Sequence, residues 1–272
     1  MFTESEPSDK AVEALFAGKT AIVTGAAHGF GRAISVEMAR RGARVVAVDA
    51  ADNELEETLA AVNLAQAYGG EGRIRRVDVT KEEEVQACVE WTVSQFGKID
   101  ILVNNAGGVL GQAHKPVETV SNLEWAKIID VNLNGVFYFI RAVATYMKDR
   151  HYGRIVNVSS GAGRSFSLTG IQAYASAKAG QIGLTRQMAR ELGAFNITVN
   201  NVAPGFVRSN PATEKQWLNM GEQGQQGLLE SISLHRLGTA EEIAYAVLFF
   251  ASDYASWVSG QVISVDGGQQ MF

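Results

Sequence analysis

Thr20-Ala-Ile-Val-Thr-Gly-Ala-Ala-His-Gly-Phe-Gly31 is the stretch that decides the fold of this chain. It predicts a short buried strand that leads directly into a glycine-rich turn and the start of a helix. In that position Gly25 permits a tight turn, Gly29 lets the backbone approach a phosphate, and Gly31 lets the helix pack on the strand. The helix N-terminus would present unpaired N–H groups to a pyrophosphate. The stretch therefore predicts a dinucleotide-binding turn.

Short apolar, β-branched runs alternate with longer segments of helical period along the rest of the chain. We expect strands at residues 20–24, 44–49, 74–77, 99–103, 154–159, 197–201 and 261–265. We expect helices near residues 30–41, 53–68, 81–96, 120–149, 172–193 and 239–251. Such alternation is typical of βαβ units, and nearly continuous Val, Ile and Ala runs indicate strands buried on both faces. The predicted fold is α/β, a doubly wound seven-stranded parallel sheet of the Rossmann type in a single domain.

The composition is that of an ordinary globular protein, with 272 residues, 46% hydrophobic and 19% charged. Its net charge of −5 argues against a nucleic-acid-binding surface. No apolar run approaches the roughly 20 residues of a membrane span. Residues 1–14 lack the basic-then-apolar pattern of a secretory signal. We expect a loosely ordered extension there, ahead of a catalytic domain at residues 15–272 of a cytoplasmic protein.

Cysteine and histidine usage points to neither a disulfide nor a metal site. Cys88, the single cysteine, lies in a helical stretch, and we expect a structural thiol in a reducing compartment. The four histidines are scattered without the spacing of metal ligands, so no metal is assigned.

The second predicted strand ends in Asp49, which lies 18 residues after Gly31. A carboxylate at this place can accept hydrogen bonds from the adenosine ribose hydroxyls and repels a 2′-phosphate. No Arg or Lys follows within residues 50–53, although His28 could offer a weak positive contact. The position favours NAD over NADP. The alternative is that Asp49 only caps the next helix.

Tyr174 and Lys178 are four residues apart in a predicted helix and therefore share one face. A nearby cation favours the phenolate, so we expect Lys178 to lower the pKa of Tyr174 from about 10. This is a route to a proton-transfer catalyst near neutral pH. On its own the pair is more typical of surface packing.

Several motifs in order make the chain resemble a short-chain dehydrogenase/reductase over nearly its whole length. The turn at 24–31 matches the cofactor turn of that family, with Phe30 where an aliphatic residue is more usual. The other matching segments are Asp78-Val79, Asn104-Asn-Ala-Gly107, Asn132, the strand at 153–160, Tyr174 with Lys178, Pro204-Gly205, and Asp266-Gly-Gly268.

The resemblance implies a catalytic group made of Asn132, Ser160, Tyr174 and Lys178. Tyr174 would exchange the proton, Lys178 would lower its pKa and bind the nicotinamide ribose, and Ser160 would hold the substrate oxygen. Asn132 would position a water in a proton relay. The implied cofactor-binding residues are Gly25, His28, Gly29, Phe30, Gly31, Asp49, Asp78, Val79, Asn105, Ala106, Gly107, Tyr174, Lys178, Pro204, Gly205, Val207 and Ser209.

Two departures from the family pattern affect these assignments. The spacing from Ser160 to Tyr174 is one residue longer than is commonest, so we expect the loop at 161–171 to bulge. Adjacent Ser159 and Ser160 leave the catalytic serine open; the pattern favours Ser160, and strand alternation then turns Ser159 to the opposite side. Ser209 stands where threonine is frequent, and its hydroxyl could still bond the nicotinamide carboxamide.

The leading hypothesis is an NAD-dependent enzyme that transfers a hydride to or from a small polyol, sugar or cyclic alcohol. The alternative within enzymes is a carbonyl reductase of the 3-oxoacyl carrier-protein type, which would use NADPH and need a basic docking patch. A nucleotide-binding regulator without catalysis is the alternative from another class.

The segment at 210–230 is rich in Gln and Gly and breaks the strand–helix rhythm, and we expect a mobile lid over the substrate. The pocket would also draw on residues 108–114 and 161–171. The long helices near 120–149 and 172–193 are surfaces that pair in the family, which implies a homotetramer.

Overall fold

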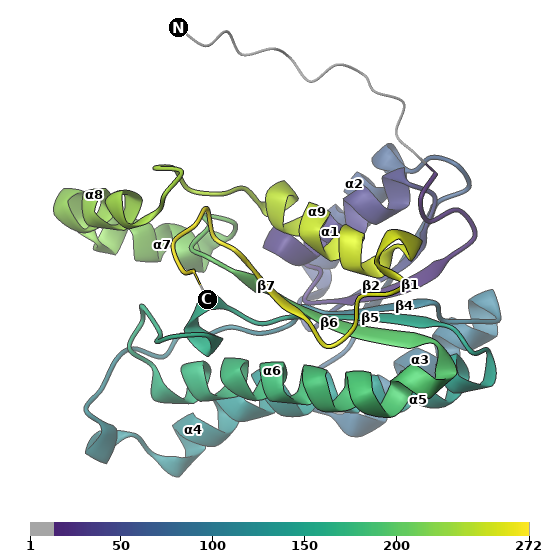
Figure 1. Cartoon of the computed structure of the whole chain (residues 1–272), viewed down its shortest axis with the longest axis horizontal. Helices are drawn as coiled ribbons and strands as arrows, with labels where there is room; N and C mark the ends of the chain where they lie inside the picture. Colours follow the sequence, from purple (N-terminus) through teal and green to yellow (C-terminus); the bar gives the residue numbers. More distant parts are fainter. Residues whose placement is uncertain (1–13, 272) are drawn as a thin grey trace, which may run out of the picture.

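A computed structural model describes residues 14–271 as a seven-stranded, wholly parallel sheet between two layers of helices (Figure 1). The strand order is β3-β2-β1-β4-β5-β6-β7, the arrangement of a doubly wound Rossmann-like sheet. The strands are β1 (Thr20–Thr24), β2 (Arg44–Asp49), β3 (Glu71–Arg76), β4 (Ile101–Asn104), β5 (Gly153–Val158), β6 (Ile197–Pro204) and β7 (Val262–Val265). The predicted fold class is confirmed, while the predicted extension at 1–14 falls, apart from Ala14, outside the described residues.

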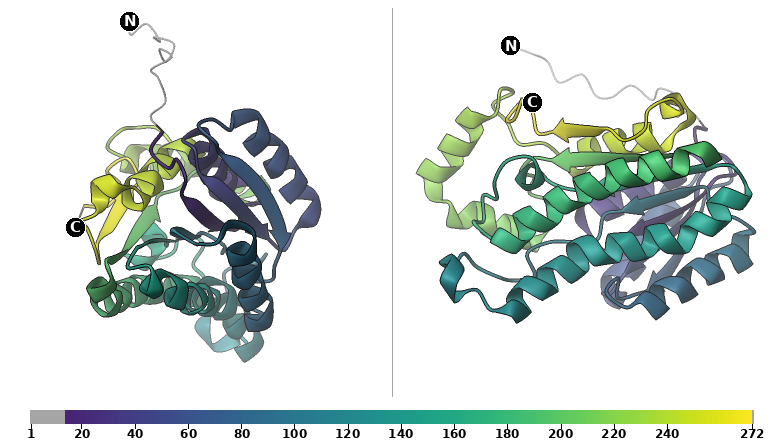
Figure 2. Two further views of the ribbon diagram at one scale, coloured as in Figure 1. Left: turned by 90° about the vertical axis from the view of Figure 1, so that its right-hand side faces the viewer. Right: turned by 60° about the horizontal axis from the view of Figure 1, so that its bottom comes forward.

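The helices cover both faces of the sheet. They are α1 (Gly29–Arg40), α2 (Asp52–Ala65), α3 (Glu82–Phe96), α4 (Asn122–Ile129), α5 (Gly135–Asp149), α6 (Gln172–Leu192), α7 (Pro211–Asn219), α8 (Gly221–Ser231) and α9 (Ala240–Ala251). Helices α1, α2 and α9 share one core with alternate strand residues such as Ala21 and Val23. Helices α3 and α5 share the other core with Ile22 and Val46. Figure 2 shows α5 and α6 running alongside each other on this second face.

The largest differences from the predicted boundaries lie at the sheet edge and at the end of β6. Strand β3 begins at Glu71, three residues before the predicted range, because its backbone pairs with β2 from Arg44 onward. Its side chains are mostly polar since it is an edge strand, and an apolar pattern misses such residues. Strand β6 runs on to Pro204 against β7 and carries the predicted Pro-Gly turn at its end.

The predicted single helix at 120–149 is interrupted. Helix α4 opens with a capping box between Ser121 and Glu124, and a π-helical turn, Asp130–Asn134, separates it from α5. The whole stretch Asn122–Asp149 is long and apolar enough to cross a membrane by length and composition. In this structure its buried side chains, most of them in α5, pack against the sheet and α3. The π turn lies at Asn132, as is frequent at functional sites.

The segment predicted as a lid forms two helices, α7 and α8, rather than an irregular insertion. Asn210 and Thr213 form the capping box of α7, with Pro211 at its first turn. Trp217 stacks on Phe206 with ring centroids 6.2 Å apart, which ties α7 to the turn after β6. Both helices project from one end of the sheet (Figure 1), and the mobility of the lid stays a prediction.

Replacing Gly31 by alanine is expected to destabilise the fold by at least about 2 kcal/mol, the scale of severe overpacking. The new Cβ would lie 2.1 Å from the carbonyl oxygen of Gly25, which is backbone and cannot turn away. Chemical denaturation measures the change. Gly183→Ala in α6 is the matched control, because nothing lies within 4 Å of its Cβ position and alanine favours a helix. Equal stability of the two variants would contradict the packing role of Gly31.

Candidate active site

The glycine-rich turn has the geometry that its sequence predicts. Gly25 and Gly29 have φ of +65° and +57°, in the left-handed region. A Cβ on Gly31 would overlap the Gly25 carbonyl, so α1 starts in direct contact with the end of β1. A Cβ on Gly29 would lie 3.1 Å from the backbone oxygen of Ser209. The turn therefore faces the segment after β6, which brings the two predicted cofactor segments together.

Side chains directly after β4 and at the end of β1 hold this turn in place. Asn105 donates from Nδ2 to the carbonyl oxygens of Thr24 and Gly25, each at 3.0 Å. Thr24 Oγ1 accepts the N–H groups of Asn105 and Ala106 at 3.1 and 3.0 Å. The side-chain amide of Asn105, a predicted cofactor residue, thus stabilises the turn through these hydrogen bonds.

Arg32 is a residue of this turn that sequence reasoning missed. Its guanidinium donates to the Ala27 carbonyl from Nε at 3.1 Å and from Nη2 at 2.5 Å, and to Glu57 at 2.9 Å. Thr58 Oγ1 donates to the Ala26 carbonyl at 2.8 Å. The position of Arg32 directly after Gly31 was the available signal. It ties the turn to α2.

Asp49 joins the end of β2 to the glycine-rich turn. Its Oδ2 accepts from the N–H of Ala27 at 3.1 Å and its Oδ1 from the N–H of Ala51 at 3.2 Å. The capping alternative is wrong, since the N-cap of α2 is Ala51 and has no side-chain cap. His28 lies 3.8 Å from the Glu54 carboxylate, so its contact is with an acid of α2.

Arg76 is a basic group beside Asp49 that the sequence did not reveal. The two residues are paired in the β2–β3 register, and the Arg76 guanidinium is exposed at 3.7 Å from Asp52. Only the sheet register brings them together, because Arg76 lies far beyond the residues 50–53 that directly follow the strand. The paired ends of β2 and β3 therefore hold both a carboxylate and a nearby cation.

Asp78 and Val79 follow β3 as predicted. Asp78 Oδ1 accepts from the backbone N–H and the hydroxyl of Thr80, at 2.9 and 2.7 Å, which closes a turn. Val79 lies against Gly135 at the start of α5, where a Cβ would come within 2.9 Å of Val79 Cγ2. The chain after β3 is thereby fixed against the helix that follows the π turn.

Asn132 and Lys178 meet at Gly107, the last residue of the predicted motif after β4. A Cβ on Gly107 would lie 2.6 Å from Asn132 Oδ1 and 3.1 Å from Lys178 Nζ. Asn132 is fully buried and its side chain bonds both the N–H and the carbonyl of Gly108, each at 2.9 Å. Its backbone oxygen accepts from Gln181 Nε2 at 2.5 Å. Asn132 thus joins the π turn to the loop after β4 and, through its backbone, to α6.

The two adjacent serines diverge as strand alternation predicts. Ser159 is buried and its hydroxyl donates to Asn201 Oδ1 at 2.5 Å. Ser160 Oγ accepts from the N–H of Ala162 at 3.1 Å, and its side chain lies close enough to the Tyr174 phenol to oppose part of the rise in the pKa of that group. Lys178 Nζ donates to the Val158 carbonyl at 3.0 Å and lies 5.7 Å from the centroid of the Tyr174 ring. The geometry therefore joins Ser160, and not Ser159, to Tyr174.

The predicted lowering of the Tyr174 pKa is wrong for this structure. Removal of the phenol from water raises its pKa, and the hydrogen bond with Ser160 offsets only part of that rise, although the residue keeps some exposed surface. Burial likewise lowers the pKa of Lys178 to about 7. Sequence spacing reveals proximity of the two groups but not their loss of solvation, which is the dominant cause for both.

A chain of buried polar side chains supports the site and was not predicted. Asn104 donates to Asn157 Oδ1 and Asn157 donates to Thr185 Oγ1, both at 2.9 Å. Asn201 donates to the same Thr185 oxygen at 3.4 Å and accepts from Ser159. The chain links the ends of β4, β5 and β6 to α6, which fixes the strand carrying Ser160 relative to Tyr174 and Lys178.

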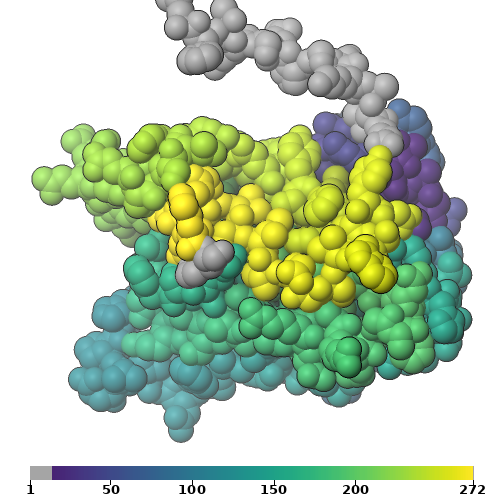
Figure 3. Space-filling model, in the orientation of Figure 1, coloured from purple at the N-terminus to yellow at the C-terminus, as the bar shows by residue number. Residues whose placement is uncertain are grey.

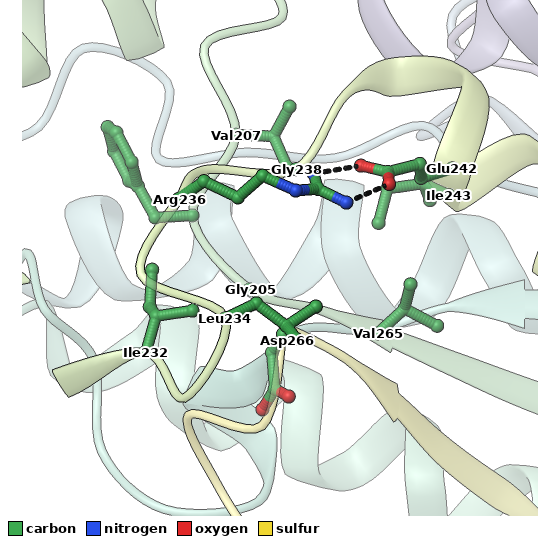
Figure 4. Close-up of a pocket in the computed structure, with 12 residues that line it drawn as sticks. Gly205, Val207, Ile232, Leu234, Arg236, Gly238, Glu242, Ile243, Val265 and Asp266 are labelled. Carbon is green, nitrogen blue, oxygen red and sulfur yellow. Dashed lines mark hydrogen bonds and ion pairs between the residues drawn. The ribbon is translucent and has the colours of Figure 1, made fainter. Parts of the chain in front are cut away.

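A cavity of about 130 Å³ lies beside the turn after β6 (Figure 4). Gly205 and Val207 line it together with Ile232 and Leu234 of the segment after α8, and it does not surround Tyr174. The Arg236 guanidinium beside it is held by two hydrogen bonds to Glu242, at 3.0 and 2.6 Å. Of the predicted residues in this segment, Gly205 and Val207 line the cavity, Ser209 lies at Gly29 of the glycine-rich turn, and Pro204 ends β6 beside Val265.

Cys88 is buried in α3, and burial raises the pKa of its thiol to about 11. This agrees with a structural thiol. Within residues 14–271 no group of three His, Cys, Asp or Glu side chains is arranged to hold a metal ion.

Comparison with known proteins gives concordant matches along the chain. Residues 25–270 match the family described as Enoyl-(Acyl carrier protein) reductase. The 3-oxoacyl-[acyl-carrier-protein] reductase FabG of Thermotoga maritima is 40% identical over 251 residues, 92% of this chain and 97% of that protein. Levodione reductase is similar in structure with a TM-score of 0.87 and 34% identity, over 93% of this chain and 98% of the other. A short-chain type dehydrogenase/reductase from Mycobacterium ulcerans is similar in structure with a TM-score of 0.86 and 30% identity, over 93% of this chain and 90% of the other.

The stability of the protein without added cofactor is expected to rise between pH 7 and 9.5 relative to Lys178→Met. Since burial lowers the folded-state pKa of Lys178 to about 7, the unfolded chain binds more protons above that pH. Burial of the charged Lys178 lowers the free energy of unfolding by its full amount below pH 7. This loss decreases as the pH rises toward the pKa of Lys178 in the unfolded chain. The gain should exceed about 1 kcal/mol, because one pKa unit is about 1.4 kcal/mol.

Urea denaturation at pH 6, 8 and 9.5 measures this difference. Lys215→Met, at an exposed lysine of α7, controls for loss of a surface charge. A constant difference between wild type and Lys178→Met across this range would contradict the depressed pKa.

Proposed function

The chain belongs to the short-chain dehydrogenase/reductase family and is an oxidoreductase, and we propose that it transfers a hydride between NAD(H) and a small secondary alcohol or its carbonyl. The observation that carries the proposal is the proximity of Ser160 and Lys178 to Tyr174, with Lys178 Nζ also lying at Gly107. A polyol, sugar or cyclic alcohol is the proposed substrate class.

The residues around the glycine-rich turn fit a dinucleotide. Gly29 leaves free a space that a Cβ would fill against Ser209, and the first N–H groups of α1 lie at this turn. The turn, Asp49 and Ser209 would hold the pyrophosphate, the adenosine ribose and the carboxamide. When bound, the nicotinamide supplies the hydride acceptor or donor.

The protein's own residues handle the proton. Ser160 Oγ is anchored by the Ala162 N–H and reaches the Tyr174 hydroxyl, so both can hydrogen-bond one substrate oxygen. In reduction the phenol of Tyr174 gives its proton to that oxygen, and in oxidation it takes the alcohol proton. Its raised pKa keeps the phenol protonated, the form that reduction needs. Lys178, held by the Val158 carbonyl beside Gly107, would bind the nicotinamide ribose.

The second candidate is a 3-oxoacyl carrier-protein-type reductase that uses NADPH. The name of the Thermotoga maritima relative favours it, and Arg76 beside Asp49 offers a cation for a 2′-phosphate. Against it, the arginines on either side of the lid are already paired: Arg208 bonds Glu214 twice at 2.8 Å, and Arg236 bonds Glu242. Paired arginines are poor partners for an acidic carrier.

A homotetramer and a cytoplasmic location are part of the same proposal. Large apolar side chains are exposed on the helices expected to pair, among them Trp125 of α4 and Phe137 of α5. Such a surface is typical of contacts between subunits.

Tyr174→Phe is expected to lower turnover by at least about a hundredfold, within the usual contribution of general acid–base catalysis. The ring and its packing remain, while the transferable proton is lost. Absorbance change of the nicotinamide with a panel of alcohols and ketones measures the effect. Tyr152→Phe is the control, since that hydroxyl bonds Asp253 away from the site. Wild-type turnover in Tyr174→Phe would refute the assignment.

Wild-type protein is expected to use NAD at least about tenfold better than NADP, and Asp49→Asn to reduce that ratio by a similar factor. Removal of the negative charge lessens the repulsion of a 2′-phosphate. The ratio of kcat/KM values with the two cofactors measures it, and Arg76→Met separates the contribution of the neighbouring cation. A wild type that prefers NADP, with that preference lost in Arg76→Met, would favour the second candidate.

A further inference from the structure

The five residues after β7 run between the lid and the catalytic loop. We call residues 266–270 the tail. Asp266 holds it in a turn, accepting the N–H groups of Gly268 and Gln270, each at 3.0 Å. Figures 1 and 3 show this end of the chain between helices α7 and α8 and the segment before α6. The tail therefore lies at the side of the expected substrate pocket.

Two adjacent glutamines of the tail bond opposite walls. Gln269 Nε2 donates to Ser231 Oγ at the end of α8, at 3.1 Å. Gln270 Nε2 donates to Ser165 Oγ at 2.5 Å, in the loop that follows Ser160. Gln269 thus bonds α8 of the lid, and Gln270 bonds the loop at 161–171, which we call the catalytic loop. Gln269 is therefore a matched control for Gln270.

The other amide atom of Gln270 is a buried acceptor without a partner. Gln270 Oε1 has no hydrogen bond, and a Cβ on Gly161 would lie 3.3 Å from it. Gly161 directly follows Ser160, which reaches the Tyr174 hydroxyl. A buried acceptor left unpaired costs free energy, and it gains that energy back when a donor arrives. The acceptor therefore lies against Gly161, the residue that directly follows the serine expected to hold the reacting oxygen.

We propose that Gln270 is a substrate-contacting specificity residue, whose carbonyl oxygen accepts a hydrogen bond from a second hydroxyl next to the reacting carbon. The inference rests on the proposed function and narrows its substrate to uncharged vicinal diols and polyols. An acceptor oxygen binds a hydroxyl donor and disfavours a carboxylate or phosphate. The hydroxyls of Ser165, Ser167 and Thr169 give the same loop further neutral polar groups.

The test compares oxidation of cyclohexanediol with adjacent hydroxyls and of cyclohexanol, with NAD and with NADP. Wild type is expected to favour the diol in kcat/KM. Gln270→Leu should reduce the diol-to-alcohol ratio about tenfold, as for loss of about 1.4 kcal/mol. Gln269→Leu should leave the ratio unchanged. Gln270→Glu, which keeps an acceptor, should retain more of the diol preference than Gln270→Leu.

A second variant and a binding measurement test the role of Gln270 independently of Gln270→Leu. If Gln270→Leu fails to fold, Gly161→Ala displaces the same oxygen through its Cβ and should lower the ratio likewise. Calorimetric binding of the diol to cofactor-saturated protein gives a readout without turnover. The role of Gln270 is overturned if the enzyme turns over and the diol-to-alcohol ratio is unchanged in Gln270→Leu, or is lowered equally in Gln269→Leu. In either case the proposed function stands. Diol binding that depends on Gln270, without turnover in wild type, overturns the proposed function and leaves the contact standing.

Discussion

The contact between Gly31 and the carbonyl of Gly25 is the constraint on which the rest of the site depends. No Cβ fits there, so α1 can begin directly on the end of β1. That crossing places the first N–H groups of the helix at the turn, and Asn105, Arg32 and Asp49 then hold the turn from three directions. The glycine-rich turn is therefore braced by the protein's own hydrogen bonds.

The catalytic end depends on a second constraint, the buried polar chain at the ends of β4, β5 and β6. Its members, Asn104, Asn157, Asn201 and Thr185, hydrogen-bond one another where an apolar core would be expected. The chain fixes the registry between the strand that carries Ser160 and the helix that carries Lys178. Burial then opposes the charged forms of both Tyr174 and Lys178, so proximity alone does not make a phenolate here.

Much of the fold could be predicted because most strands are short apolar runs and the glycine-rich turn directly follows β1. Strand β2 agrees with its prediction to the residue, as does β1. The predictions are wrong where the apolar pattern of the side chains does not follow the backbone structure. Strand β3 pairs through polar edge residues. The π turn at Asn132 interrupts a helix although the apolar pattern continues across it. The segment at 210–230 has a weak pattern and still forms α7 and α8, since Asn210 and Pro211 start the first of them.

The sequence by itself determined the parallel α/β sheet, the position of the nucleotide turn, and the candidacy of Ser160, Tyr174 and Lys178, because these depend on local pattern and on order along the chain. Only the tertiary structure decided which groups share an environment. It put Arg76 beside Asp49, joined Ser160 to Tyr174, withdrew Tyr174 and Lys178 from water, and brought Gln270 to the catalytic loop from more than a hundred residues away. Solvation and long-range proximity arise from packing, and no local pattern of residues encodes them.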